Sequence, residues 1–228
     1  MQDLKKQLES SLSIVLPAKN EALNIESVIR KIHALNLHCE ILVVDDGSSD
    51  NTSEIAKNLG VRVITHPYSL GNGAAVKTGA RNALGEIVVF MDADGQHNPD
   101  DIPDLLKKLN DGYDMVVGAR HPSTHSSIVR RIGNTIYNRL ASFMTQHHIE
   151  DLTSGFRVVR KEKFKRFMYL LPNGFSYPTT STMAFFRSGF HVGYVPIHAG
   201  TRKGESHISV LKDGSRFFIV ILRVGALF

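Results

Sequence analysis

The chain has 228 residues, and 42% of them are hydrophobic, which fits one globular domain with at most a small appendage. Its single cysteine, Cys39, excludes an internal disulfide framework and favours a reducing compartment. Residues 1–11 are polar and include four charged side chains, which argues against a secretory signal at the start of this sequence.

The formal net charge of +5 is unevenly distributed along the chain. From residue 157 to the end, twelve Lys and Arg residues stand against three Asp and Glu residues, so the preceding part is net acidic. This asymmetry suggests a metal–nucleotide site in the acidic part and an anionic partner for the basic part. Charge alone leaves nucleic acid, anionic lipid and a phosphorylated substrate open as that partner.

Short apolar runs alternate with helical patterns up to residue 120. The apolar runs predict strands at residues 13–16, 40–44, 61–65, 86–90 and 115–118. The intervening segments predict helices at residues 21–35, from Ser49 or Asp50 to Gly60, at 71–83 and at 100–109. Such alternation predicts an α/β fold, with an open, mostly parallel, Rossmann-like sheet covered by helices on both faces.

Beyond residue 120 the alternation is less regular. We expect a mobile loop at residues 123–127, helices at 128–145, 161–170 and 179–188, and a strand at 192–197. We divide the chain into an N-terminal extension (residues 1–12), one main domain (13–210) and a C-terminal segment (211–228).

The C-terminal segment contains a fully apolar run at residues 217–222, followed by Arg223. A helix from Gly214 to the end would rise roughly 22 Å at about 1.5 Å per residue, whereas a bilayer core is about 30 Å thick. We therefore expect an amphipathic or juxtamembrane helix whose Arg216 and Arg223 reach the headgroups. A helix packed on the domain is one alternative, and a chain that stops where membrane helices would begin is another.

The most informative motif is the segment at residues 91–99, MDADGQHNP, directly after the strand expected at 86–90. Asp92 and Asp94 are two residues apart, so in extended chain their carboxylates lie on one face and repel each other unless a cation lies between them. Gln96 offers a neutral oxygen. An oxygen ligand set suits Mg²⁺ or Mn²⁺ and often shares the ion with substrate phosphates. A polar turn without metal is the alternative.

Polar groups also follow the strands expected at 13–16 and 40–44. Glu21 comes after the first, and Asp45 and Asp46 come after the second. In an open parallel sheet the carboxyl ends of strands form the ligand-binding edge, so a nucleotide pocket is plausible there. Asp45 or Asp46 would accept from a base or a ribose hydroxyl, and Glu21 would do the same or hold its loop. The alternative for the Asp46 segment is a tight turn.

Other motifs argue against several further classes of site. The chain lacks a Gly-x-Gly-x-x-Gly after its first strand and a P-loop lysine motif, which argues against dinucleotide dehydrogenases and P-loop enzymes. The glycines at residues 71–73 favour close helix packing over anion binding, and we expect Lys77 to be solvated. His97 and the pair His147 and His148 are candidates for a transition-metal site, but a solvated surface is favoured for the pair.

These motifs together resemble the inverting family 2 glycosyltransferases with the GT-A fold, and within them the polyprenyl-phosphate hexosyltransferases of the dolichyl-phosphate mannose synthase type. The resemblance covers residues 13–209, nearly the whole chain. The broad family is indicated by PAKNE (17–21), VVDDGSSDNT (43–52) and MDADGQHNP (91–99). The polyprenyl-phosphate branch is indicated by VVGAR (116–120), DLTSGFRVVR (151–160) and RKGESH (202–207).

The resemblance implies a donor site for a GDP- or UDP-linked hexose with Mg²⁺ or Mn²⁺ as cofactor. Asp92, Asp94 and Gln96 are then the metal ligands, and Asp94 is also a catalytic residue. The nucleotide sugar is expected to contact eight residues: Pro17, Lys19, Glu21, Val44, Asp46, Asp92, Ala93 and Arg120.

The resemblance also implies an acceptor site for a polyprenyl phosphate at the cytoplasmic face of a membrane. Arg130, Arg131, Arg202 and His207 are expected to bind the acceptor phosphate, and Arg120, Arg131 and Arg202 to act in catalysis. Metal and arginines would stabilise the charge that develops on the leaving diphosphate, and a phosphate acceptor needs no strong base. The resemblance implies peripheral association with the membrane, or anchoring if the chain is truncated, and no nucleic-acid partner; it leaves the oligomeric state open.

Two departures from the family pattern affect the acceptor side. His207 stands where members often carry lysine after Gly-Glu-Ser, and residues 178–180 read Pro-Thr-Thr where members often place a carboxylate. Both departures put the acceptor, more than the donor, in question, and they motivate an inactive membrane-binding relative as one alternative. A family 2 transferase with a soluble sugar or protein acceptor is another alternative, and it would need a carboxylate base near the sugar.

Overall fold

The computed structural model describes residues 12–120, 128–174, 176–198, 200 and 210–227, the side chains of 128–132, 210–217 and 227 excepted. The strands are β1 (Leu12–Ala18), β2 (Cys39–Asp45), β3 (Arg62–Thr65), β4 (Ile87–Phe90), β5 (Met115–Arg120), β6 (Arg157–Arg160) and β7 (Val192–Ile197). The helices are α2 (Ile25–Ala34), α3 (Thr52–Asn58), α4 (Asn72–Asn82), the 3₁₀ turn η1 (Pro99–Asp101), α5 (Ile102–Asn110), α6 (Ile128–Thr145), α7 (Lys161–Lys165), α8 (Tyr177–Arg187) and α9 (Val210–Leu227).

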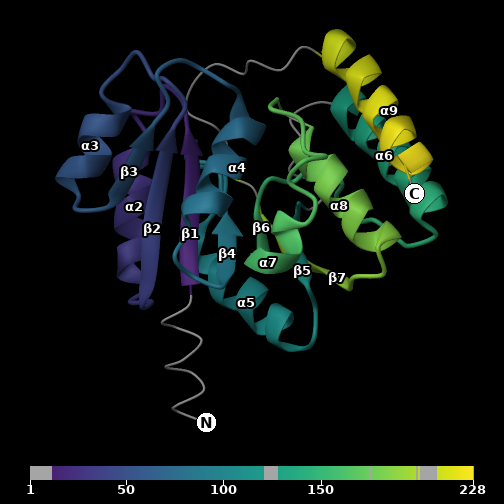
Figure 1. The fold of residues 1–228 in the computed structure, drawn as a ribbon, viewed down its shortest axis with the longest axis horizontal. Coiled ribbons are helices and arrows are strands. Elements are labelled where there is room, and N and C mark those ends of the chain that lie inside the picture. The colour runs from purple at the N-terminus through teal and green to yellow at the C-terminus, as the bar shows by residue number, and fades with distance from the viewer. Residues whose placement is uncertain (1–11, 121–127, 175, 199, 201–209, 228) are drawn as a thin grey trace.

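The strands of the described residues form one seven-stranded sheet in the order β3-β2-β1-β4-β6-β5-β7 (Figure 1). Strand β6 runs antiparallel to both of its neighbours, β4 and β5, and the other pairings are parallel. The expected α/β fold with a mostly parallel sheet is confirmed. The reversed strand β6 was not anticipated, because its four residues, RVVR, carry no signal for direction.

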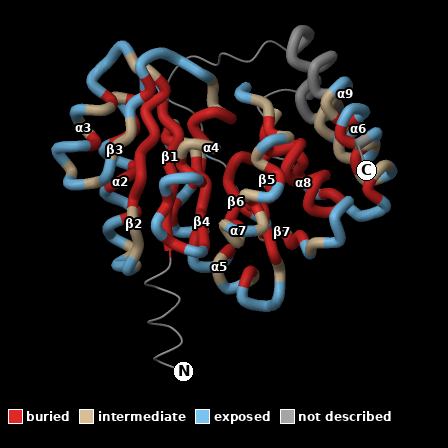
Figure 2. The backbone as a smooth tube through the Cα atoms, in the orientation of Figure 1, coloured by how far each residue is buried: buried red, intermediate tan, exposed pale blue. Residues whose placement is uncertain are grey.

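Two hydrophobic cores cover the two faces of the sheet. Alternate residues of β1 point to opposite faces: Val15 packs with α4, α7 and α8, whereas Ile14 and Leu16 pack with α2, α3 and α5. Most strand residues and nearly all of α8 are buried, as the red segments of Figure 2 show. Burial on both faces explains why the strands are continuous apolar runs.

Helices α6 and α9 form an outer layer on the α8 side of the molecule, where Figure 1 shows them side by side. Ile221 and Val224 of α9 are buried in the core with α8, but Phe218, Ile219 and Leu222 are between 43% and 60% exposed. In the part of the chain that the structure describes, each helix is too short or too polar to cross a membrane. The C-terminal helix thus packs on the domain and also exposes an apolar face.

Several element boundaries differ from those expected. The first strand begins at Leu12, inside the expected N-terminal extension, and the helix expected at residues 161–170 ends at Lys165. The chain continues from there in turns, with hydrogen bonds from Met168 N–H to the Lys165 carbonyl and from Leu170 N–H to the Phe167 carbonyl. The loop expected at residues 123–127 lies outside the described residues.

The first turn of α4 is clasped by the segment at residues 172–174. The N–H groups of Gly73 and Ala74 donate to the carbonyls of Gly174 and Asn173, so this turn is occupied by chain contacts and close packing is confirmed. Lys77, expected to be solvated, instead donates to the Leu171 carbonyl (3.0 Å) and to Asn173 Oδ1 (2.6 Å). A lysine on α4 thereby ties down a segment almost a hundred residues away in sequence, which no local pattern reveals.

We expect Gly73→Ala to lower the free energy of unfolding by about 1–3 kcal/mol, the usual cost of overpacking. A Cβ at Gly73 would lie 2.1 Å from the Pro172 carbonyl oxygen, although alanine is otherwise the better helix former. Urea denaturation measures the change. Gly133→Ala in α6 is the matched control, because its Cβ would lie 3.8 Å from the nearest atom and should leave stability unchanged or higher. A Gly73→Ala protein as stable as the wild type would contradict this prediction.

Candidate active site at the carboxyl edge of the sheet

One edge of the sheet gathers the polar segments that the sequence singled out. Ala18 pairs with Asp45, and Val15 pairs with Phe90, so the ends of β1, β2 and β4 lie side by side. Because β6 is antiparallel, it begins at this same edge, and the segment at residues 151–156 leads into it. Strands β5 and β7 also end here, with Arg120 paired to Ile197. The expected convergence of strand ends is confirmed, and the 151–156 segment joins it.

The segment after β4 alternates between buried and partly exposed side chains. Met91 and Ala93 are 1% exposed, whereas Asp92 and Asp94 are partly exposed. The N–H of Gln96 donates to Asp94 Oδ1 at 3.0 Å and shapes the turn that follows. The pattern places both acidic residues on the accessible side of this segment and buries the alanine between them.

The residues around Asp92 fit a hard divalent cation. Asn72 Nδ2 lies 3.4 Å from Asp92 Oδ1, and Asn72 Oδ1 is buried without a hydrogen-bond partner among the described residues. Within the described residues, no group of three His, Cys, Asp or Glu side chains could hold a metal. A divalent cation held by two carboxylates and amide oxygens would therefore have to take its remaining ligands from water or from phosphate oxygens.

Asp46 at the end of β2 is a structural acceptor in this structure. It accepts hydrogen bonds from the side chains of His66 (2.7 Å) and Ser69 (2.8 Å) and from the N–H groups of Leu70 and Gly71 (2.8 Å each). Burial acts to raise the pKa of Asp46, but these hydrogen bonds outweigh it and hold the pKa below its ordinary value. Asp46 thus fixes the loop between β3 and α4 against the edge of the sheet.

The other residues expected to bind the nucleotide differ in accessibility. Lys19 is exposed, and its ammonium donates to Ser69 Oγ at 2.9 Å. Glu21 is 7% exposed and accepts from Asn24 Nδ2 at 2.8 Å, so it holds its own loop. Pro17, Val44 and Ala93 are buried, and Val44 packs in the core with α4. These three side chains therefore lie inside the domain, beneath the exposed residues at this edge of the sheet.

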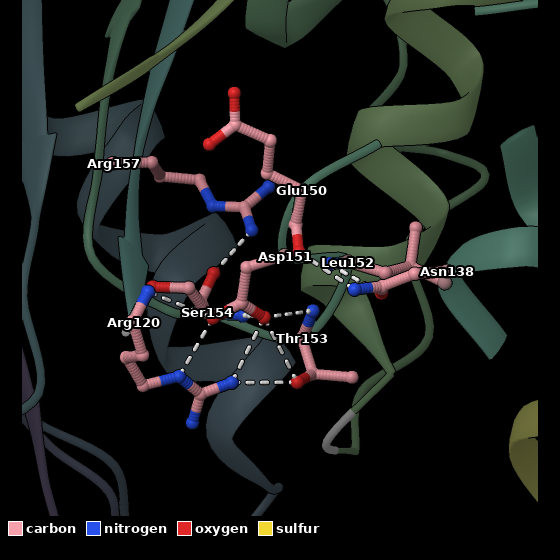
Figure 3. Close-up of polar contacts among 8 residues, drawn as sticks. All are labelled: Arg120, Asn138, Glu150, Asp151, Leu152, Thr153, Ser154 and Arg157. Atoms are coloured by element: carbon pink, nitrogen blue, oxygen red, sulfur yellow. Dashed lines mark hydrogen bonds and ion pairs between the residues drawn. The ribbon is translucent and has the colours of Figure 1, made fainter. Parts of the chain in front are cut away.

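Arg120 at the end of β5 forms a bidentate ion pair with Asp151 (Figure 3). Arg120 Nε and Nη2 donate to the two carboxylate oxygens at 2.8 and 2.9 Å, and Nη2 also donates to Thr153 Oγ1 at 2.6 Å. The N–H groups of Thr153 and Ser154 complete the shell around Asp151 Oδ1 at 3.0 and 3.1 Å. The third guanidinium nitrogen of Arg120 points away from Asp151 in Figure 3.

The charges of this pair support each other. Burial acts to lower the pKa of Arg120, but the neighbouring charge of Asp151 outweighs it and holds the pKa above its ordinary value. Burial likewise acts to raise the pKa of Asp151, and Arg120 with the surrounding N–H groups holds it below its ordinary value. The charge of Asp92 also acts to raise the pKa of Arg120.

Sequence reasoning missed three buried residues here. Asp151 and Arg157 were noted only as parts of motifs, although they are 5% and 0% exposed. His97, considered with the surface histidines, is 6% exposed and stacks on Phe156 with ring centroids 5.1 Å apart. Burial lowers the pKa of His97 to about 4, so the ring is neutral near pH 7. The local sequence around these three residues gave no sign that they are buried.

Arg202 and His207 lie outside the described residues. Arg130 and Arg131 belong to α6, but their side chains also lie outside the described part. His147 and His148 are exposed, as expected.

Comparison with known proteins gives three results. The model of "Glycosyl transferase family 2" matches residues 13–168. A dolichyl-phosphate hexose transferase from Haloferax volcanii is 31% identical over 215 residues, with 93% of each chain covered, and glycosyltransferase AglJ from the same organism is 29% identical, with 93% of this chain and 71% of that one covered.

Among solved structures, glucosyl-3-phosphoglycerate synthase from Mycobacterium tuberculosis in complex with Mn²⁺ and uridine-diphosphate-glucose superposes with a TM-score of 0.80. It shares 23% sequence identity, and the alignment covers 99% of this chain and 83% of that one, so the two proteins share a fold. With the fold, the strand-end motifs and the family model in agreement, the chain belongs to glycosyltransferase family 2 and is a transferase.

Proposed function

We propose that this protein transfers a hexose, with inversion, from a GDP- or UDP-linked donor to the phosphate of a polyprenyl phosphate at the cytoplasmic face of a membrane. The observation that carries the proposal is similarity across 93% of both chains to a dolichyl-phosphate hexose transferase. The first turn of α8 supports the phosphate acceptor, and the outer face of α6 and α9 supports the association with a membrane.

On the donor side, Asp92, Asp94 and Gln96 hold Mg²⁺ or Mn²⁺ together with the diphosphate. Lys19 and the loop fixed by Asp46 lie beside the nucleoside. The buried Pro17 and Val44 lie beneath the nucleoside site. Bound metal offsets negative charge on the leaving diphosphate. Arg120, held by Asp151, adds a fixed positive charge near the same segment, and its rigid geometry lowers the reorganisation needed during transfer.

On the acceptor side, the first turn of α8 argues against a hydroxyl acceptor that needs a base. Residues 177–180 read Tyr-Pro-Thr-Thr, and Thr179 and Thr180 are 0% and 1% exposed. This turn therefore supplies no carboxylate. A phosphate monoester is already anionic near neutral pH and attacks without a general base. Arg130, Arg131, Arg202 and His207 are proposed to bind it, with Arg131 and Arg202 also assisting transfer.

The membrane-facing part of the proposal rests on the outer layer. Exposed apolar side chains lie on both helices, at Ile136 and Phe143 of α6 and at Phe218, Ile219 and Leu222 of α9. A cluster of this kind on paired helices suits the interfacial region of a bilayer, with Arg223 on α9 able to reach headgroups. The residues at 211–228 are proposed as this interfacial segment.

A donor and acceptor matrix tests the proposal. Radiolabelled UDP- and GDP-hexoses are incubated with Mn²⁺ and with either polyprenyl phosphate in vesicles or 3-phosphoglycerate, the acceptor type in the name of the structural neighbours. We expect label in the butanol-extractable lipid. Label in the soluble product alone would favour a soluble acceptor, and no transfer with metal-dependent nucleotide binding intact would require another acceptor.

Ile219→Asp is expected to weaken binding to anionic vesicles about tenfold or more. Ile219 is 60% exposed on α9, and burial of one such side chain contributes roughly 1.5–3 kcal/mol. Vesicle flotation measures the effect. Leu84→Asp is the matched control, because Leu84 is 75% exposed between α4 and β4, away from the outer layer. Equal loss of binding in both variants would contradict the assignment of this face.

A further inference from the structure

Arg157 of β6 is a fully buried cation, and among the described residues no carboxylate forms an ion pair with it. Its Nη1 donates to Pro178 O (3.1 Å), Ser181 Oγ (2.7 Å) and Thr182 Oγ1 (3.2 Å), all on α8. Its Nη2 donates to the carbonyl of Ser154, as Figure 3 shows. Arg157 Nε has no hydrogen-bond partner among the described residues. The Met115 sulfur (3.8 Å from Nη1) and the Tyr177 ring (5.6 Å from Cζ to the ring centroid) also contact the guanidinium. Its partners in the described part of the chain are therefore all neutral, and its Nε–H is not satisfied.

Burying the charge of this guanidinium costs free energy of folding. A buried guanidinium loses its hydration, and neutral acceptors recover only part of that loss. Burial accordingly lowers the pKa of Arg157, while Tyr177 and Tyr194 and, to a smaller extent, the charges of Asp151 and Asp92 act to raise it. Since Asp151 is already paired with Arg120, Arg157 adds positive potential beneath the segment that carries Asp92. The contacts of Arg157 alone do not account for a charged residue at this position.

The backbone that Arg157 holds is the one that touches Asp92. Nη2 binds the carbonyl of Ser154, and Tyr177 Oη donates to the next carbonyl, that of Gly155, at 3.1 Å. A Cβ at Gly155 would lie 2.8 Å from Asp92 Oδ2, so this residue forms the wall against which Asp92 rests. Arg157 and Tyr177 thus fix the wall from behind.

The same turn also connects Arg157 to Arg120. Ser154 N–H donates to Asp151 Oδ1, and Asp151 holds Arg120. One buried cation therefore sets the position of a turn that contacts both an acidic residue of the proposed metal site and the acid that orients Arg120.

We propose that Arg157 is a positioning residue for the metal–diphosphate site. It clamps the turn at residues 154–155 so that Asp92 keeps its position for the cation, and it does so without touching substrate. This inference rests on the proposed donor site. It predicts that loss of Arg157 impairs metal-dependent nucleotide binding more than it impairs folding.

Equilibrium titration of UDP and GDP, with and without Mn²⁺, tests the inference on the full chain. For each nucleotide, the readout is the dissociation constant without Mn²⁺ divided by the dissociation constant with Mn²⁺. Thermal unfolding without ligand is measured in parallel. We expect Arg157→Met to reduce this ratio at least tenfold, and Arg157→Lys to retain part of it because the charge remains. Gly155→Ala should reduce it similarly, because its Cβ displaces Asp92 without any change in charge.

Lys163→Met is the matched control. Lys163 pairs with Asp114, which precedes β5 at the opposite edge of the sheet, so this variant loses a cation without affecting the turn at residues 154–155. It should lose stability and keep the wild-type ratio. Wild-type ratios in both Arg157→Met and Gly155→Ala would overturn the positioning role alone. A wild-type protein whose nucleotide binding ignores Mn²⁺ would overturn the donor site itself, and this inference with it.

Discussion

Asp94→Asn should reduce the rate of hexose transfer by about 10²–10³-fold or more, with little change in stability. Asp94 is partly exposed, and its Oδ1 accepts from the N–H of Gln96. Asparagine keeps an oxygen for that hydrogen bond, so the turn should persist, whereas the negative charge that attracts the cation is lost. Initial rates over a series of Mn²⁺ concentrations, together with thermal unfolding, measure both effects.

Asp111→Asn is the control for this prediction, because Asp111 is an exposed carboxylate just after α5 and outside the carboxyl edge. It should transfer hexose at the wild-type rate. Chelation of the metal from the wild type should mimic Asp94→Asn, and added Mn²⁺ should restore the wild type only. Full activity of the Asp94 variant with metal present would remove Asp94 from the site.

Local sequence patterns were sufficient to predict the buried parallel strands and the position of the two aspartates that follow one of them. The buried parallel strands read as apolar runs because both faces of the sheet are covered, and Asp92 and Asp94 follow one of them with a spacing that puts them on one side. The antiparallel direction of β6 had no such signal. That reversal brings the segment at 151–156 to the carboxyl edge, so the partner of Arg120 comes from 31 residues further along the chain.

Burial of charged and polar residues was the harder part to predict. Arg157 is a charged residue in a four-residue strand, and its burial depends on hydroxyl groups of α8 more than twenty residues away in sequence. His97 is buried because it stacks on Phe156, which the β6 segment supplies. The carboxylate of Asp46, predicted to contact the nucleotide, also accepts hydrogen bonds from the loop between β3 and α4, which no local pattern indicated. In each case a tertiary contact decides the role.

Asp151→Asn should destabilise the protein by on the order of 3 kcal/mol, because it leaves the Arg120 guanidinium without its counter-charge. The Asp151 and Arg120 side chains are 7% and 24% exposed, so water screens the pair only in part. Urea denaturation at pH 7 measures the loss. A double variant with Arg120→Met should recover part of it, since both charges are then absent, and additive losses would show that the two residues do not interact.

The pH dependence of the same variant provides an independent check. The folded-state pKa of Asp151 lies below its ordinary value of 3.8, so the stability it contributes is complete above pH 5 and is lost as the pH falls through the folded-state pKa. The wild type should therefore lose stability steeply below about pH 4, and Asp151→Asn should lose less over the same interval. Parallel acid limbs in the two proteins would mean that the Asp151 carboxyl titrates alike in the folded and unfolded chain, which would contradict the ion pair seen in Figure 3.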